Sequence, residues 1–302
     1  MGMQENMRLL TRLHPITIFC YMTAVLGIAM FCLNPVMQVC SLLGACILLW
    51  MLSGRIAWRR VPVYVLFFAM IAGMNPLFYH NGATVLFYLN GNRITLEAVR
   101  YGICTACMLG GVFLWCRSLS QMFSSDRVLC LLGAVSPKAA LICSMTLRFL
   151  PMYARQMEKT KAQQRLLGLY QEHTLFDRIR GSLKVFAAVT TWAFEHSMHT
   201  ADSMQARGYG ACRRTQYRRW RFGRRDAVLC GAVILLSIAI VIEMSRGSVS
   251  MRFYPVTQTV PFGAESVITY LCYAAVCLSL PAALYVMRIK RMWVESRERE
   301  IE

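Results

Sequence analysis

HPITIFCYMTAVLGIAMFCL, residues 14 to 33, is a run of twenty residues without lysine, arginine, aspartate or glutamate. A helix needs roughly 20 apolar residues to cross the hydrocarbon layer of a bilayer, with about 17 as the lower limit. The run is therefore long enough to span a membrane by itself. It follows a twelve-residue start without a convincing cleavage site, so we expect a signal anchor rather than a removed signal peptide.

Similar apolar runs continue outward from this one, over residues 36–53, 61–78, 103–116, 227–242 and 267–287. The run at 103–116 is the shortest, and to span it must start near Leu96 and include Glu97 and Arg100. Only 16% of the 302 residues are charged, whereas soluble domains carry about 25%. We therefore expect an all-α, polytopic membrane protein with about six transmembrane helices.

The basic residues predict the orientation of these spans, because lysine and arginine concentrate on the cytoplasmic side of membrane proteins. With the N-terminus inside, the inside segments are 1–12, 53–60, 117–225 and 288–302, and they hold 29 of the 33 basic residues. We expect both termini in the cytoplasm of a bacterial cell, with the chain in its plasma membrane. Three parts follow: a four-span membrane domain (1–116), a cytoplasmic region (117–225), and a two-span hairpin with a short tail (226–302).

An arginine-rich segment, SMQARGYGACRRTQYRRWRFGRRD, occupies residues 203–226 just before the fifth span. Arginines in this position meet anionic lipid headgroups, at about 1 kcal/mol each. Nucleic-acid binding calls for such a patch on a soluble domain with stacking aromatics, and a bilayer interface explains the aromatic residues here more simply. We expect membrane lipids and no nucleic acid as partners, with Arg207 set apart because it precedes the patch.

Two long helices are predicted in the cytoplasmic region, over about 137–167 and 176–206. Ser136 and Pro137 suit the first helix start, and Gly168 its end. The first helix carries an apolar stripe, made of Leu141, Met145, Phe149 and Met152. The second carries a seam of mostly small residues that lets a neighbouring helix approach closely. That seam consists of Leu183, Phe186, Thr190, Ala193, Ser197, Ala201 and Met204.

Each of these helices ends in a glycine with an arginine within three residues of it. An apolar face resting on the inner leaflet and a polar end directed at a soluble partner fit this pattern. The planar fork of an arginine binds a carboxylate through two hydrogen bonds. No metal site is expected: Cys104 and Cys107 lack further ligands within their apolar run, and His196 and His199 lack a third ligand at metal spacing.

Three stretches resemble the transmembrane T component of energy-coupling factor transporters, the EcfT/CbiQ family. They are NPLFYHNGATVLFYLNGNRITLEAV (75–99), MTLRFLPMYA (145–154) and ADSMQARGYG (201–210). The resemblance covers nearly the whole chain. It implies that the two long helices are coupling helices whose Ala-Arg-Gly ends dock into two ATP-binding-cassette ATPases. It also implies that their apolar faces hold a membrane-embedded substrate-binding partner, the S component, which ATP-driven motion topples to release a vitamin or metal ion.

The family motif carries over unevenly onto the two helix ends. Ala206, Arg207 and Gly208 match it on the second helix. On the first helix Gly168 matches, but Leu166 and Leu167 stand in the alanine and arginine places, and Arg165 comes two positions early. These seven residues are the candidate ATPase-docking sites. Leu141, Met145, Phe149, Met152, Phe186, Ala193, Ser197 and Ala201 are the candidate face for the S component or for helix packing.

The leading hypothesis is therefore a non-catalytic coupling subunit that binds no cofactor directly, with ATP and magnesium used by the partner ATPases. The chain has no GxxxxGK[ST] phosphate loop. A T component of a dedicated cobalt or nickel importer is the nearest alternative. A stand-alone secondary transporter predicts an internal repeat of interrupted helices, and a membrane-embedded enzyme predicts a paired nucleophile and base. The sequence contains neither feature.

Overall fold

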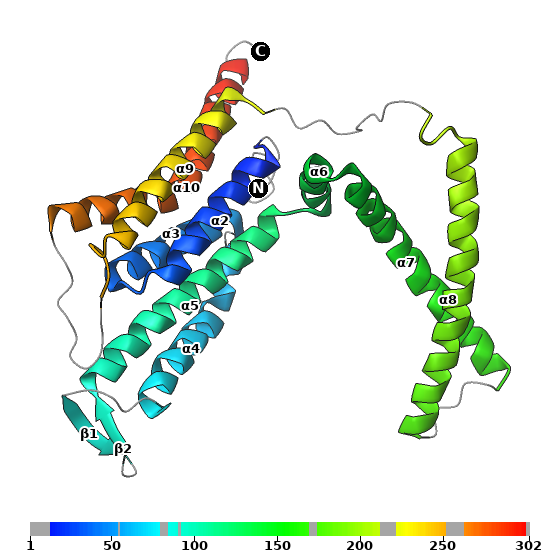
Figure 1. The fold of residues 1–302 in the computed structure, drawn as a ribbon, viewed down its shortest axis with the longest axis horizontal. Coiled ribbons are helices and arrows are strands. Elements are labelled where there is room, and N and C mark those ends of the chain that lie inside the picture. Colours follow the sequence, from blue (N-terminus) through cyan, green and yellow to red (C-terminus); the bar gives the residue numbers. More distant parts are fainter. Residues whose placement is uncertain are drawn as a thin grey trace. The chain divides into compact units, whose positions relative to one another are not determined.

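The computed structural model describes residues 13–53, 55–78, 84–89, 92–168, 174–211, 222–251 and 263–299 (Figure 1). The chain divides into two compact units. We call residues 1–127 and 220–302 the membrane unit, and residues 128–219 the helix-pair unit. Each is described separately.

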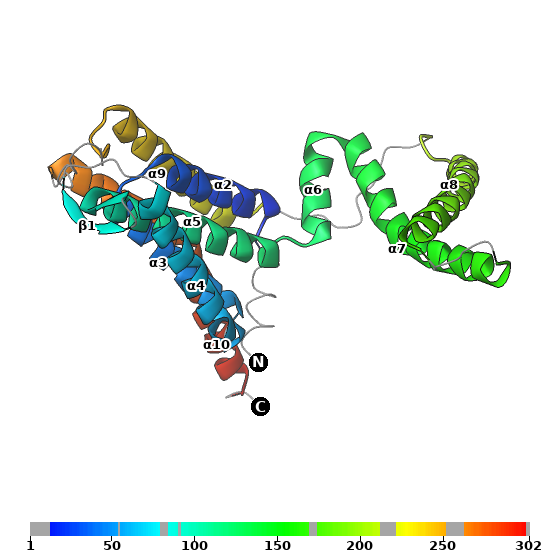
Figure 2. The same cartoon turned by 90° about the horizontal axis from the view of Figure 1, so that it is seen from below.

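Among its described residues, the membrane unit contains six apolar helices and one small hairpin (Figures 1 and 2). The helices are α2 (Pro15–Phe31), α3 (Pro35–Ser53), α4 (Arg55–Phe78), α5 (Leu96–Met122), α9 (Arg224–Ser245) and α10 (Ala264–Arg299). Five of them are long and apolar enough to cross a membrane, and α2, with 17 residues, is a shorter apolar helix. Each of the six predicted runs thus lies in its own helix, which confirms the polytopic, predominantly α-helical fold.

The helix ends follow the local signals in the sequence. The His14 side chain accepts a hydrogen bond from the Ile16 amide at the start of α2, where Pro15 occupies the first turn. Thr95 caps α5 in the same way by accepting from the Ala98 amide. The fourth span therefore begins at Leu96, as expected, but it continues beyond the predicted limit at residue 116 as far as Met122.

The core of the membrane unit lies where α3 packs against α5 and α10. The fully buried indole of Trp115 donates a hydrogen bond to the Ser41 hydroxyl (3.1 Å). A Cβ atom on Gly44 would lie 2.8 Å from the Cys277 Cβ, so only glycine permits this approach of α3 to α10. Small residues at helix contacts are typical of membrane proteins, because association there depends on close packing.

Buried polar groups join the turn between α2 and α3 to the segment after α9 and to α10. The Asn34 side chain donates to the Val249 carbonyl (3.1 Å) and the Tyr270 hydroxyl (2.9 Å). Its oxygen accepts from the Val36 amide (3.0 Å). One buried side chain therefore makes three hydrogen bonds, two of them to segments distant in the sequence.

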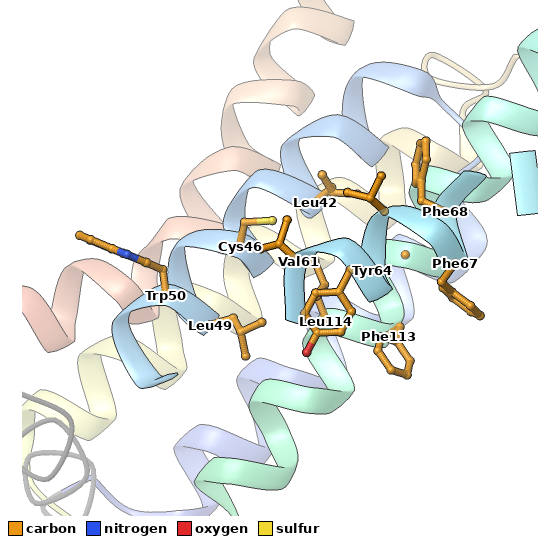
Figure 3. A pocket seen from close by; sticks show the side chains of 12 residues that line it. Leu42, Cys46, Leu49, Trp50, Val61, Tyr64, Phe67, Phe68, Phe113 and Leu114 are labelled. Atoms are coloured by element: carbon orange, nitrogen blue, oxygen red, sulfur yellow. The ribbon is translucent and has the colours of Figure 1, made fainter. Parts of the chain in front are cut away.

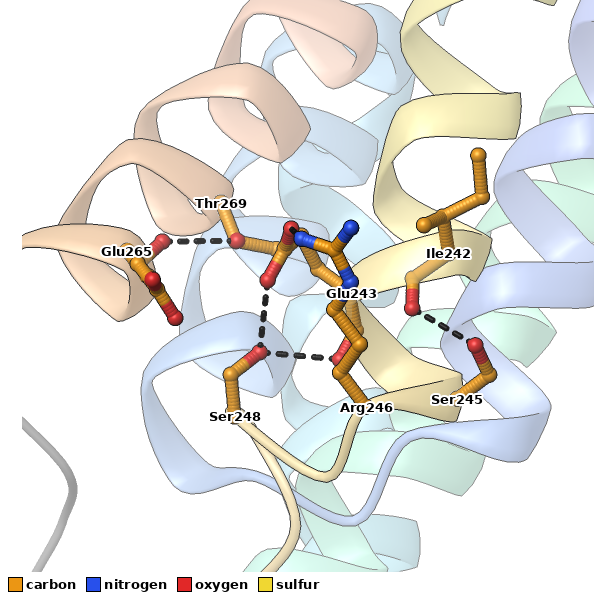
Figure 4. A network of polar contacts seen from close by, with 7 residues as sticks. All are labelled: Ile242, Glu243, Ser245, Arg246, Ser248, Glu265 and Thr269. Atoms are coloured by element: carbon orange, nitrogen blue, oxygen red, sulfur yellow. Dashed lines mark hydrogen bonds and ion pairs between the residues drawn. The ribbon is translucent and has the colours of Figure 1, made fainter.

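Charged groups at the last turn of α9 bond to one another (Figure 4). Arg246 pairs with the Glu243 carboxylate at 3.0 Å, and the Ser248 hydroxyl donates to the same carboxylate at 3.1 Å. The sequence placed Glu243 at or near a span end, and the structure agrees.

A two-stranded antiparallel hairpin precedes α5, formed by β1 (Val85–Leu89) and β2 (Asn92–Thr95). It was not predicted from the sequence. The signal was present, because the dipeptide Asn90-Gly91 between two short strand-forming runs is a strong hairpin indicator. The Glu97 carboxylate accepts a hydrogen bond from the Thr84 hydroxyl (2.8 Å) and anchors the hairpin to the first turn of α5.

The helix-pair unit contains α7 (Pro137–Leu166) and α8 (Leu175–Ala206), which agree with the predicted 137–167 and 176–206 within one residue. An additional helix, α6 (Ser125–Val135), was not predicted; it begins at the edge of the membrane unit and continues into the helix-pair unit. The two long helices cross as an X (Figure 1). No described residue of α7 is fully buried, and only three are in α8, so most of the surface of this pair is exposed.

Candidate functional site

Four aromatic rings form the crossing of α7 and α8. Phe149 lies edge-on to His196 (5.8 Å between ring centroids), and Tyr153 lies edge-on to Trp192 (6.0 Å). On α8 the Trp192 and His196 rings stack at 5.2 Å. Edge-to-face and stacked pairs each contribute about 0.5–1.5 kcal/mol beyond their buried area. The later residue of α7, Tyr153, meets the earlier residue of α8, Trp192, so the two helices run in opposite directions through the crossing. Their C-terminal tips therefore lie on opposite sides of it.

The four residues of the predicted stripe on α7 are alike in burial, while their role as a face for the S component stays a prediction. Leu141, Met145, Phe149 and Met152 are all partly buried, and Phe149 belongs to the aromatic crossing. These residues recur every three or four positions, which places them on one side of a helix.

The predicted seam on α8 is wrong as the face that packs within this pair. Of its four candidate residues only Ala193 is partly buried; Phe186 is 59% exposed, and Ser197 and Ala201 are also exposed. The buried residues of α8 are Gly181, Val185 and Val189.

The error has a simple physical cause. Small residues predict a close helix contact, but in α8 two valines are buried instead and the large rings of Trp192 and His196 meet α7. Aromatic residues spaced i, i+4 on both helices, at 149 and 153 and at 192 and 196, were the overlooked signal, because such residues lie on one face.

The end of α8 is a fully formed Schellman cap. Gly208 has φ +78°, its amide donates to the Gln205 carbonyl (2.9 Å), and the Tyr209 amide donates to the Met204 carbonyl (3.0 Å). These two bonds define the motif and require a left-handed residue after the last helical one, which favours glycine. Arg207 is the capping residue itself and is exposed. The helix thus ends with a cationic side chain held at its tip.

The end of α7 has the positive-φ glycine and one of these two hydrogen bonds; the amide of residue 169, which would donate the other, lies outside the described residues. Gly168 has φ +69° and its amide donates to the Arg165 carbonyl (3.1 Å). Leu167 is the capping residue, equivalent to Arg207, and Leu166 is 89% exposed. Arg165 lies two residues before this position, which is roughly 200° around the helix axis. The α7 tip therefore presents leucines where the α8 tip presents an arginine.

The two tips are well separated along their helices. From the crossing near residue 151, α7 continues for about 15 residues, or roughly 22 Å at 1.5 Å per residue. From the crossing near residue 194, α8 continues for about 12 residues, or roughly 18 Å. The pair can therefore engage two distinct partner surfaces.

Within the described ranges no group of three or more His, Cys, Asp or Glu residues is placed to hold a metal ion. His196 lies in the aromatic crossing. Residues 212–221, which hold five of the eight arginines of the arginine-rich segment, fall outside the described residues, so the assignment of the segment to lipid headgroups stays a prediction.

A family model described as cobalt transport protein, CbiQ, matches residues 6–217, which is more than half of the chain. The chain belongs to the CbiQ family. This CbiQ-family chain is 27% identical over 198 residues to energy-coupling factor transporter transmembrane protein EcfT 1 of Listeria monocytogenes, covering 57% of this chain and 74% of that protein. It is 26% identical over 237 residues to the protein EcfT of Listeria innocua, covering 67% and 89%.

One similar protein of a different kind is named a putative ABC transporter ATP-binding protein, from Bifidobacterium longum. The identity is 26% over 189 residues, which covers 59% of the CbiQ-family chain but only 24% of that larger protein. Together with the apolar helices, these relationships make the chain a multi-pass membrane subunit of a transporter family.

Proposed function

We propose that the chain is the coupling subunit of an energy-coupling factor importer, and that it transmits the ATP-driven motion of two ATPase subunits to a membrane-embedded S component. The observation that carries the proposal is the exposed, Schellman-capped tip at Arg207, on a helix pair that is mostly unburied. Similarity to the named EcfT proteins supports the same function. The match to part of a protein named as a putative ABC transporter ATP-binding protein supports this function as well. Fusion in one polypeptide is one way to keep a membrane subunit together with an ATP-binding subunit.

In this proposal the tip of α8 enters an acidic groove on one ATPase. Arg207 supplies two parallel hydrogen bonds to a carboxylate there, and the positive-φ glycine lets the chain turn away directly behind it. The tip of α7 enters the second ATPase mainly through Leu166 and Leu167, because Arg165 lies on another side of the helix. The exposed Phe186, Ser197 and Ala201 of α8 are then available to the S component.

The test is co-purification of the ATPases with the tagged chain from membranes, followed by ATP-driven uptake. Arg207→Glu should abolish both, because a carboxylate partner now repels the tip, while the chain stays in the membrane. Arg165→Glu should have a milder effect. Arg178→Glu, an exposed site in the first turn of α8, is the matched control. Normal uptake by Arg207→Glu contradicts the docking role.

The orientation is part of the proposal: both termini in the cytoplasm of a bacterial cell, which puts the helix-pair unit on the side where ATPases work. It is supported by the 29 basic residues on the predicted inside segments. A fluorescent protein fused after residue 302 should fluoresce and an alkaline phosphatase fused there should be inactive. The opposite pair of results overturns the orientation.

A dedicated cobalt or nickel importer is the second candidate, favoured by the description of the matching family model. Here the metal ion is the substrate and the S component recognises it. Identification of the small membrane protein that co-purifies with the chain distinguishes a vitamin from a metal ion. Uptake of radiolabelled cobalt by cells that express the complete transporter is the direct measurement.

A further inference from the structure

An apolar pocket of about 460 Å³ lies among α3, α4 and α5 of the membrane unit (Figure 3). Both α3 and α4 pack along α5, but they make few contacts with each other, and this gap forms the pocket. Cys46 of α3, Tyr64 of α4 and Phe113 of α5 represent its three walls. The volume is within the range of pockets that hold small ligands, about 300–1,000 Å³.

The pocket cannot be left empty or filled with water at low cost. A void of this size deprives its lining of dispersion contacts, and a cavity lined by apolar side chains stays dry because water finds no hydrogen-bond partners. The pocket is partly open and lies within the apolar spans Pro35–Ser53, Val61–Phe78 and Leu96–Met122. The surrounding material at that depth is hydrocarbon chain.

One end of the pocket has a different character. Trp50, near the end of α3, and Val61, near the start of α4, line this end, opposite Phe67 and Phe68 (Figure 3). Tryptophan is enriched at the membrane–water interface. The first two turns of α4, directly before Val61, carry three arginines, Arg55, Arg59 and Arg60, in the sequence RIAWRR. Arginine in this position attracts anionic headgroups.

We propose that this pocket is a binding site for one anionic phospholipid, with an acyl chain between α3, α4 and α5 and the headgroup beyond Val61, at the N-terminal end of α4, where the sequence is rich in arginine. The acyl chain fills the gap that α3 and α4 leave between them and so holds α4 in place. Because hydrocarbon is already the solvent there, the acyl chain contributes packing, and the headgroup contributes the selectivity. The site does not depend on ATPase docking.

Gly110 provides the means to close the pocket. A Cβ at this position would lie 3.6 Å from Phe68 and 3.8 Å from Leu42, so a small addition is tolerated and a leucine side chain takes the ligand's space. Gly73, on an exposed side of α4, has nothing within 4 Å of its Cβ direction. Gly110→Leu and Gly73→Leu are therefore the same substitution inside and outside the pocket.

The experiment uses the full chain in nanodiscs of zwitterionic lipid that contain a trace of phosphatidylglycerol with a photoreactive diazirine on its acyl chain. Peptide mapping should place the label mainly on residues 61–68 and 110–114. Gly110→Leu should remove this label and Gly73→Leu should retain it. Replacing Arg59 and Arg60 by Gln should reduce labelling by about fivefold for each arginine, while Arg178→Gln, in the helix-pair unit, should not.

Three results overturn the proposal. The first is even labelling of all lipid-facing helices, unchanged by Gly110→Leu, which indicates only annular lipid. The second is equal labelling by a phosphatidylcholine probe with no effect of the arginine pair. The third is capture of a membrane protein, and no lipid, by a photoreactive residue at position 64, which assigns the pocket to a partner helix. The arginine variants lie before the span, so they keep the test decisive if Gly110→Leu fails to fold.

Discussion

Replacing Gly208 by alanine isolates the contribution of the α8 cap to partner binding. The residue has φ +78°, where an L-amino acid costs about 1–2 kcal/mol relative to its usual conformation. A Cβ at this position has the Ala211 Cβ as its nearest neighbour, at 4.0 Å, so the cost is purely conformational. Gly208→Ala should avoid this conformational cost by leaving the left-handed region, which breaks the two capping hydrogen bonds that the Gly208 and Tyr209 amides donate. Loss of the cap displaces Arg207.

The magnitude follows from the fraction of molecules that keep the cap. A cost of 1–2 kcal/mol lowers the apparent affinity for the ATPases by about 5- to 30-fold, because only the capped form binds. The assay is titration of the purified chain in detergent or nanodiscs with the isolated ATPases. Gly208→Asn should lose less, since asparagine tolerates the left-handed region better.

Gly210→Ala is the matched control. This residue also has a positive φ, +93°, and no atom within 4 Å of its Cβ direction, but neither of the two hydrogen bonds that define the cap involves it. It should therefore affect binding much less than Gly208→Ala. Unchanged affinity in Gly208→Ala, with a folded chain, refutes the idea that the cap presents Arg207.

Two further predictions concern packing. Trp192→Ala removes the ring contact with Tyr153 that joins the two helices, worth about 0.5–1.5 kcal/mol, and also the stack on His196 within α8. The distribution of distances between spin labels on the two helix tips should therefore broaden. Phe194→Ala, at an exposed neighbour, should leave this distribution unchanged, and equal broadening in both variants contradicts the assignment of the crossing. Gly44→Ala forces a Cβ to within 2.8 Å of the Cys277 Cβ and should destabilise the membrane unit by about 1–3 kcal/mol, seen as a lower thermal midpoint in detergent. Gly231→Ala, where nothing lies within 4 Å, should not lower the midpoint, and a Gly44→Ala midpoint equal to that of the wild type shows that this contact adjusts without cost.

The lengths and ends of α7 and α8 could be predicted from the sequence because their signals are local. Ser136 and Pro137 mark the start of α7, and the glycines at 168 and 208 follow the ends of α7 and α8. These residues act through the backbone within one turn, so no tertiary information is needed. The same holds for the apolar runs, since length and the absence of charge suffice.

The rotation of α8 about its axis could not be predicted by the same means. Its surface carries apolar side chains on several sides, including the exposed Leu183, Phe186 and Phe194, because part of that surface is open to other molecules. A helix with more than one apolar side has no single stripe to identify the face that meets its neighbour. Only the aromatic residues of α7 select the face that carries Trp192 and His196.

The position of the aromatic crossing along α8 divides this helix into a packed arm and an exposed arm. About 19 residues precede the crossing and about 12 follow it, giving arms of roughly 28 Å and 18 Å at 1.5 Å per residue. Gly181, Val185 and Val189 are buried along the first arm. The second arm has no fully buried residue, so the end that carries Arg207 can shift without unpacking the rest of the helix pair.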